Sequence, residues 1–186
     1  MFDLDRFKAD CSAVAHERPA VDAIREILVK AMEDPGGVQK AVSESGRAGV
    51  QALHRSPDLT ILNVVWGPRM TVMPHNHNMW AVIGIYSGRE DNIFWRRLPG
   101  EGSRRIEAAG AKALCDRDVF PLGRDIIHSV TNPIGRLTGA IHVYGGDFFG
   151  APRSEWDPEH LTEQRYDVQK ALQLFEESNR FRSARG

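Results

Sequence analysis

The chain has 186 residues, of which 41% are hydrophobic, and this suits one substantial buried core better than two domains. Its 24 basic and 25 acidic residues leave a formal net charge of −1, which argues against a nucleic acid or a membrane surface as the partner. No apolar run approaches the ~18 residues of a membrane span, and the acidic start of the chain does not fit a signal peptide. We therefore expect a cytoplasmic protein that binds no nucleic acid and no membrane.

The first 46 residues predict helices. An apolar face recurs at helical spacing at Leu4, Phe7, Cys11 and Val14. Asp3 precedes this face and is the expected N-cap. A second helix should begin near Pro19 and end at Pro35-Gly36-Gly37, and a short third helix should cover about Val38 to Ser43.

From Val50 to Tyr144 the pattern changes to β-branched and aromatic runs separated by Gly, Pro and charged turns. Strands are predicted near 49–54, 59–66, 70–74, 79–86, 91–97, 104–109, 112–115, 118–120, 126–131 and 137–144. Many short strands at this spacing indicate a sandwich or a small barrel. Beyond an irregular stretch from Gly145 to Pro158, one helical face is expected at Val168, Leu172 and Phe175.

These elements predict a single domain over 1–186. A helical segment over 1–46 leads into a β-barrel over 47–150, and 151–186 forms a C-terminal extension with a helix. The two cysteines lie in apolar patterns, Cys11 in a helix and Cys115 in a strand-like run. We expect two buried thiols rather than a disulfide, as in other cytoplasmic proteins.

His75 and His77 are the clearest functional signal in the chain. Alternate side chains of a strand share a face, so two imidazoles at this spacing can bind one metal ion. A third imidazole comes from His128, in another strand-like run after Gly123. Three neutral imidazoles leave coordination positions open for a substrate, which favours a catalytic metal over a polar strand edge.

These residues resemble the two sequence motifs of the cupin superfamily, a His-x-His with a later glycine and a Pro-x-Gly followed by His and Asn. The matching residues are His75, His77, Gly88, Pro121, Gly123, His128 and Asn132. The acidic ligand of the first motif is missing, because Ala81 or Val82 stands in its place. The resemblance implies a mainly β fold, the cupin double-stranded β-helix or jelly-roll barrel, with N-terminal helices and a C-terminal helix.

A cupin without that acid is similar to the thiol dioxygenases, the group of cysteine dioxygenase, and the similarity spans about residues 53 to 155. Trp66-Gly67-Pro68 and Ile141-His142-Val143-Tyr144 resemble the family's Trp-Gly and His-x-Tyr segments. Trp80 follows the His-x-His as it does in the mercaptopropionate branch. The resemblance implies Fe(II) on three histidines. It also implies oxidation by O₂ of a small thiol, of the cysteine or 3-mercaptopropionate type, to a sulfinate.

The same resemblance assigns roles to other side chains. Tyr144 would direct its hydroxyl at the metal, and His142 would hydrogen-bond this tyrosine rather than bind the metal. Two arginines are alternatives for a substrate carboxylate, Arg55 as in cysteine dioxygenases and Arg153 as in the mercaptopropionate branch. Trp80 would form part of the pocket wall. Each arginine could instead be a surface residue, and Tyr144 could be only a core aromatic.

Other functions use the same three histidines. Cupins also include isomerases, decarboxylases and non-thiol dioxygenases, and the missing acid does not exclude them all. A non-catalytic sensor of a metal or a small molecule would bind metal without turnover. The sequence also leaves open a homo-oligomer.

Overall fold

The computed structural model describes residues 1–16, 19–42, 46–100 and 102–183, so Ser43 of the third predicted helix lies outside the described residues. The helices are α1 (Leu4–Val14), α2 (Ala20–Ala31), α3 (Pro35–Val42) and α4 (Val168–Ser183). The strands are β1 (Gly49–Arg55), β2 (Thr60–Trp66), β3 (Thr71–Asn76), β4 (Ala81–Ser87), β5 (Arg89–Arg97), β6 (Ile106–Cys115), β7 (Val119–Leu122), β8 (Ile127–Thr131), β9 (Thr138–Tyr144), β10 (Ser154–Trp156) and β11 (Glu163–Arg165).

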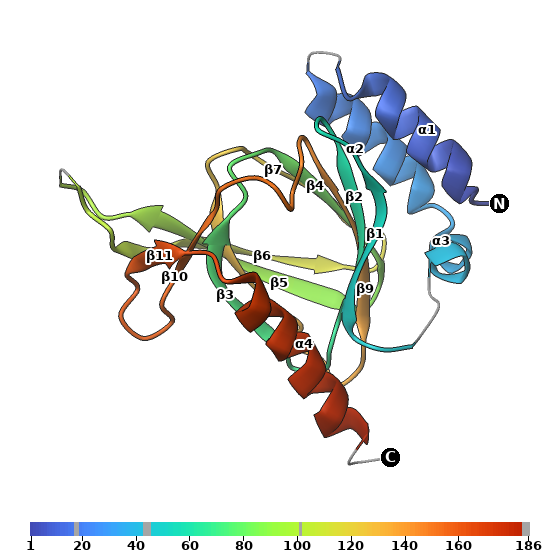
Figure 1. Cartoon of the computed structure of the whole chain (residues 1–186). Helices are drawn as coiled ribbons and strands as arrows, with labels where there is room; N and C mark the ends of the chain where they lie inside the picture. Colours follow the sequence, from blue (N-terminus) through green and yellow to red (C-terminus); the bar gives the residue numbers. More distant parts are fainter. Residues whose placement is uncertain (17–18, 43–45, 101, 184–186) are drawn as a thin grey trace.

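Two antiparallel sheets form the body of the molecule (Figure 1). Within the described residues, one sheet has the order β1-β2-β9-β4-β7 and the other has the order β11-β10-β3-β8-β5-β6. The pairs β2–β9, β3–β8, β4–β7 and β5–β6 therefore alternate between the sheets, as in a long hairpin wound into a barrel. This is a double-stranded β-helix, and the predicted fold class, with helices at both ends, is confirmed.

The central strands of the five-stranded sheet, β2, β9 and β4, are buried on both of their faces. In β9, Ala140 and Tyr144 pack into the barrel interior, whereas Ile141 and Val143 pack into the cluster that includes α1, α2 and α3. The alternation follows from the two-residue period of a strand. Figure 1 shows these three helices beside this sheet and α4 in a separate position at the barrel.

Close contact between the N-terminal helices and the sheet depends on Gly84 of β4. A Cβ atom at this position would lie 3.0 Å from a methyl group of Leu28 and 3.3 Å from the terminal methyl of Met32. Both side chains are almost completely buried. The cap of α1 is the predicted one, since the Asp3 side chain accepts a hydrogen bond of 2.9 Å from the backbone N–H of Arg6.

The boundary between α2 and α3 differs from the prediction. Helix α2 ends at Ala31, and Pro35 begins α3 instead of only terminating α2. Proline is suited to the first helical position because its missing N–H would have no partner there. Asp34 accepts a hydrogen bond of 3.0 Å from the backbone N–H of Gly37 and so caps the new helix.

Three predictions for the β region are corrected. The segments 104–109 and 112–115 form one strand, β6, which pairs with β5 across an irregularity at Phe94 and Trp95. The stretch after Gly145 is not wholly irregular, because it contains β10. Cys115 is exposed instead of buried, because its neighbour Leu114 faces inward and successive side chains of a strand point to opposite faces. Cys11 is buried, and both thiols are free.

Gly88 and Asn132, from the two sequence motifs, shape turns. Gly88 joins β4 to β5 with φ of 93°, and a Cβ there would contact Thr138. Asn132 is fully buried and donates hydrogen bonds to the backbone carbonyls of Trp66, Gly67 and Arg136. Among the described helices, none has the length and apolar character needed to cross a membrane.

Candidate metal centre

Three histidines converge inside the barrel. In the register of β3 against β8, His75 lies directly opposite His128. His77 follows one residue after the end of β3, so it reaches the cluster from a turn and not from the strand that the sequence suggested. The potential ligand atoms of His75, His77 and His128 lie within 4.8 Å of one another, and all three residues are buried.

Hydrogen bonds fix the ring orientation of two of these histidines. The Nδ1 atom of His75 lies 2.9 Å from the carbonyl oxygen of Met73, and Nδ1 of His128 lies 2.6 Å from Oδ1 of Asn92. A carbonyl oxygen only accepts, so both Nδ1 atoms carry the proton and both Nε2 atoms are free to bind a metal. Such partners are typical of histidines that ligate metals.

The three imidazoles are neutral at physiological pH. Burial lowers the pKa of His75 to about 4. Burial lowers the pKa values of His77 and His128 well below their ordinary range, and neighbouring histidines lower them further. A metal binds the neutral form of imidazole, so the ligands need not release a proton first.

The donor set fits a divalent transition metal. The Nε2 atoms of His77 and His128 are 3.3 Å apart, close to the separation of two nitrogens that each lie roughly 2.1 Å from one metal ion. Among the described residues, the cluster contains no carboxylate. At the position of the missing acidic ligand, Ala81 packs in the barrel interior and Val82 packs toward the helices.

Tyr144 and His142 lie beside this cluster on β9. The Tyr144 hydroxyl is 3.0 Å from Nδ1 of His142, and the Tyr144 ring meets the His77 ring edge-on at 5.0 Å between centroids. Burial raises the pKa of Tyr144, which keeps its hydroxyl protonated. The structure therefore brings this pair, which the sequence analysis singled out, against the three histidines.

Arg153 is a buried cation in the same pocket. Its guanidinium is sandwiched between the rings of Phe148 and Tyr166, at 3.9 and 4.2 Å from their centroids. Its Nη1 atom has no hydrogen-bond partner, and no carboxylate in the described part of the chain forms an ion pair with it. Burial lowers the pKa of Arg153. The site thus has an oriented cation that lacks a counterion.

Arg55 and Trp80 lie outside this pocket. Arg55 is half exposed, makes a two-pronged ion pair with Asp147 at 2.8 and 2.9 Å, and lies over the Phe149 ring. Trp80 packs against Gly145 and the apolar cluster beneath the N-terminal helices. Of the three residues considered for substrate binding, Arg153 alone lines the pocket.

The pocket is small and mostly apolar. Its volume is about 90 Å³. Aliphatic and aromatic side chains from the barrel wall, from the loop after β9 and from α4 surround the histidines. They include Val64, Trp66, Val72, Phe148, Leu172 and Phe175. Phe175 of α4 stacks on Trp66 at 5.5 Å, so the C-terminal helix supplies one wall.

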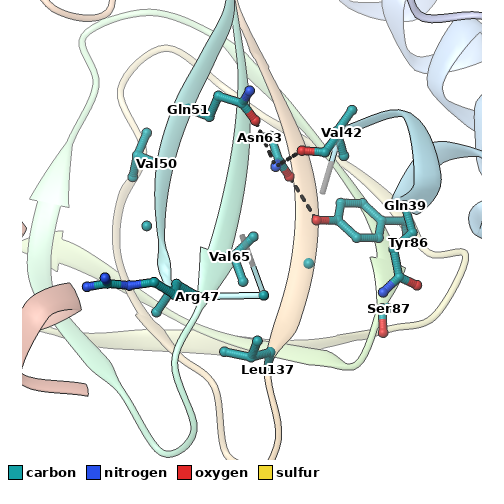
Figure 2. A pocket seen from close by; sticks show the side chains of 14 residues that line it. Gln39, Val42, Arg47, Val50, Gln51, Asn63, Val65, Tyr86, Ser87 and Leu137 are labelled. Atoms are coloured by element: carbon teal, nitrogen blue, oxygen red, sulfur yellow. Dashed lines mark hydrogen bonds between the residues drawn. The ribbon is translucent and has the colours of Figure 1, made fainter. Parts of the chain in front are cut away.

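A larger cavity, of about 340 Å³, lies elsewhere and has no comparable chemistry (Figure 2). Three of its polar side chains bond to one another. Tyr86 donates to Asn63 at 2.8 Å, and Asn63 donates to Gln51 and to the Val42 carbonyl. Among the residues that the structure describes, its lining contains no histidine, cysteine or carboxylate. Volume alone would therefore not have pointed to the three histidines.

Sequence analysis missed four residues of the pocket region. They are Glu90, Asn92, Phe148 and Tyr166. Glu90 and Asn92 are two residues apart at the start of β5, so they share a face of the strand, and both are buried. That spacing was a usable signal, but Arg89, Glu90 and Asp91 resemble a charged turn. Phe148 and Tyr166 lie in irregular segments, where no periodicity could identify them.

No protein-family model matches the chain. Several solved structures resemble it. An RmlC-like cupin family protein from Methanocaldococcus jannaschii has a TM-score of 0.45 at 9% identity, covering 57% of this chain and 86% of that one. An uncharacterized Klebsiella pneumoniae protein with a double-stranded β-helix domain has a TM-score of 0.47 at 15% identity, covering 63% and 87%. Oxalate oxidase in complex with glycolate has a TM-score of 0.41 at 14% identity, covering 56% and 53%.

Removal of one ligand should abolish metal binding. We expect the protein to bind about one divalent transition-metal ion per chain, and His128→Ala to bind much less because two imidazoles remain. Elemental analysis after equal metal loading measures this. His160→Ala is the matched control, because His160 is exposed and pairs with Asp157. Equal metal content in the His128 and His160 variants would exclude the three-histidine site.

Acid should destabilise the metal-free protein. Burial lowers the pKa of folded His75 to about 4, whereas in the unfolded chain it titrates near ~6.5. The unfolded state therefore takes up a proton first as the pH falls from about 6.5 toward 4, and the free energy of unfolding decreases. For His75 the loss is on the order of 2–3 kcal/mol by pH ~4.5.

Urea unfolding of the metal-free parent and of His75→Gln at neutral and acidic pH isolates this contribution. The parent should lose more stability on acidification than the variant, whatever their stabilities at neutral pH. An equal loss in the two proteins would show that His75 does not titrate in this way.

Proposed function

We propose that the protein is an iron-dependent dioxygenase that converts a small thiol carboxylate into its sulfinate with O₂. Both atoms of O₂ are added to sulfur, so R–S⁻ and O₂ give R–SO₂⁻ and no further reductant is needed. The observation that carries the proposal is the buried Arg153, without a counterion, in the same pocket as three neutral histidines.

Three histidine ligands support a catalytic rather than a structural metal. A structural zinc site usually has four protein ligands, whereas three leave positions for reactants. When bound, iron(II) would supply those positions for the thiolate and O₂, and the associated redox chemistry. The protein residues supply binding, orientation and a dry environment.

Arg153 supports a carboxylate on the substrate. A buried cation is costly unless it is paired, and a planar guanidinium pairs with a carboxylate through two parallel hydrogen bonds. Phe148 and Tyr166 hold the guanidinium plane on both faces, which orients the fork before the substrate arrives. A thiol carboxylate could then be bound at both ends, sulfur at the metal and carboxylate at Arg153.

The size of the pocket supports a small substrate. A volume of about 90 Å³ corresponds to roughly three water molecules, so only a molecule of a few heavy atoms fits without movement of the walls. The mostly apolar lining lowers the local dielectric constant, and this strengthens the interaction between Arg153 and an anion.

Tyr144 supports chemistry beside the metal. Because its hydroxyl remains protonated and its ring lies against the His77 ring, it can donate a hydrogen bond to sulfur or oxygen of the bound reactants. A phenol in this place would orient the reactants, and its partner His142 can accept or return the phenolic proton.

Turnover separates this proposal from the alternatives. We expect the iron-loaded protein to consume O₂ with 3-mercaptopropionate or cysteine and to form the corresponding sulfinate, about one O₂ per sulfinate. An oxygen electrode combined with mass spectrometry of the product measures both quantities. Glycolate and propionate, which lack sulfur, are the controls. O₂ consumption with these acids but not with the thiols, or iron binding without any turnover, would reject the proposal.

Exchange of Arg153 for lysine should identify the carboxylate contact. Arg153→Lys keeps the charge but loses the paired donors, so kcat/KM for 3-mercaptopropionate should fall about tenfold or more. Activity toward 2-mercaptoethanol, an uncharged thiol, should change little, and iron content should be unchanged.

Arg55→Lys is the matched control, because Arg55 pairs with Asp147 outside the pocket. In this variant the ratio of kcat/KM for 3-mercaptopropionate to kcat/KM for 2-mercaptoethanol should stay near that of the parent. If Arg55→Lys alters this ratio and Arg153→Lys does not, the carboxylate is bound by Arg55.

A further inference from the structure

Glu90 is a fully buried carboxylate that has no role in the function proposed above. It lies near the start of β5 with no exposed surface. Its Oε2 atom accepts a hydrogen bond of 2.6 Å from Nε1 of Trp66, and its Oε1 atom accepts one of 3.0 Å from Nδ2 of Asn92. Both oxygens therefore accept from donors, and among the described residues Glu90 does not belong to the group of side chains that could hold a metal ion.

Two of the neighbours of Glu90 connect it to the metal centre. Asn92 contacts His128, the third histidine of the cluster, since its Oδ1 atom lies 2.6 Å from Nδ1 of His128. On the other side, Oε2 of Glu90 lies 3.3 Å from Nε2 of His142, whose Nδ1 atom faces the Tyr144 hydroxyl at 3.0 Å. We call Trp66, Glu90, Asn92, His128, His142 and Tyr144 the Glu90 network.

An ionised carboxylate determines the direction of every hydrogen bond in this network. It only accepts, so Asn92 must turn its NH₂ group toward Glu90 and its carbonyl oxygen toward His128. That carbonyl in turn requires the proton on Nδ1 of His128, which leaves Nε2 for the metal. Trp66 could not orient Asn92 in place of Glu90, because the NH₂ group of Asn92 needs an acceptor and Nε1 of Trp66 can only donate.

The same logic applies to His142. Its Nε2 atom faces the carboxylate at 3.3 Å, an ion-pair distance, and has no hydrogen-bond partner within the described part of the chain. If Nε2 carried no proton, it and the Glu90 oxygen would be two acceptors facing each other. Nε2 therefore carries a proton whether the ring is neutral or charged. Proton exchange with Tyr144 is then confined to Nδ1.

The charge on Glu90 is consistent with this arrangement. Burial by itself would raise the pKa of Glu90, but His142 and the donors Asn92 and Trp66 together keep it below the ordinary value. A carboxylate that accepts from several donors in a dry interior remains ionised.

We propose that Glu90 is the positioning residue of this centre: its carboxylate keeps the proton on Nδ1 of His128, through Asn92, and on Nε2 of His142. One buried acid thus leaves a ring nitrogen of His128 free for the metal and confines proton transfer at His142 to Tyr144. Only the use of that proton transfer rests on the proposed thiol oxidation. The tautomers and metal affinity are independent of the substrate.

Glu90→Gln tests the direction of the network because it adds a donor without changing shape. Trp66 still requires an oxygen on its side, so the new NH₂ group faces Asn92. Asn92 must then turn its carbonyl toward this new NH₂ group and its own NH₂ group toward His128, which moves the His128 proton to Nε2 and obstructs metal binding. Affinity for Co²⁺ should fall about 10- to 100-fold, although no ligand has changed.

A second substitution should reverse this loss. In the double variant Glu90→Gln with Asn92→Asp, the new carboxylate accepts both from the glutamine NH₂ group and from Nδ1 of His128. Most of the Co²⁺ affinity should return, measured by competition with a chelator. If Glu90 only supported the fold, a second substitution that also removes a native side chain would not restore the Co²⁺ affinity.

Long-range ¹H–¹⁵N NMR of histidine-labelled, metal-free protein reads the tautomers directly, with His128→Ala and His142→Gln to assign the signals. We expect protons on Nδ1 of His128 and Nε2 of His142 in the parent, and on Nε2 of His128 in Glu90→Gln. Opposite tautomers in the parent overturn the proposal, even if Glu90→Gln does not fold. So does unchanged Co²⁺ affinity in a folded Glu90→Gln, or a loss that Asn92→Asp does not reverse. A parent with these tautomers that oxidises no thiol would reject only the proposed function.

Discussion

Burial of neutral imidazoles inside an apolar barrel is the constraint on which the rest of this structure depends. His75, His77 and His128 are almost completely removed from bulk solvent there, so their ring nitrogens need partners within the site. The Met73 carbonyl accepts a hydrogen bond from Nδ1 of His75, and the Asn92 side-chain carbonyl accepts one from Nδ1 of His128. Their remaining nitrogens converge with His77, and a bound cation would satisfy all three at once.

The barrel contains two buried charges that are stabilised in different ways. The Glu90 carboxylate is stabilised within the protein and needs no ligand, because Trp66 and Asn92 donate to it and His142 lies against it. The Arg153 guanidinium is only partly stabilised, because aromatic rings cover its faces while Nη1 lacks a hydrogen-bond partner among the described residues. The first arrangement suits a residue that organises the site, and the second suits a residue that awaits an anion.

Segments outside the barrel strands complete the pocket. The loop after β9 brings Phe148 to Tyr144, with ring centroids 4.4 Å apart, and the ion pair between Arg55 and Asp147 anchors this loop from outside. Helix α4 adds Phe175 against Trp66. Strands β3 and β8 and the residue just after β3 thus supply the three histidines, whereas this loop and α4 supply pocket walls from outside the barrel strands.

The sequence alone determined the helical face of α1, its Asp3 cap, most strands and the three histidines, because each depends on local spacing or residue type. Only the tertiary structure placed Arg153 in the pocket, placed Arg55 and Trp80 outside it, and revealed the buried Glu90. These outcomes depend on which strands pair, in which register, and on where loops without periodicity place Phe148 and Tyr166. Contacts between residues far apart in the chain leave no local pattern, so a buried carboxylate such as Glu90 resembles a charged turn until its neighbours are known.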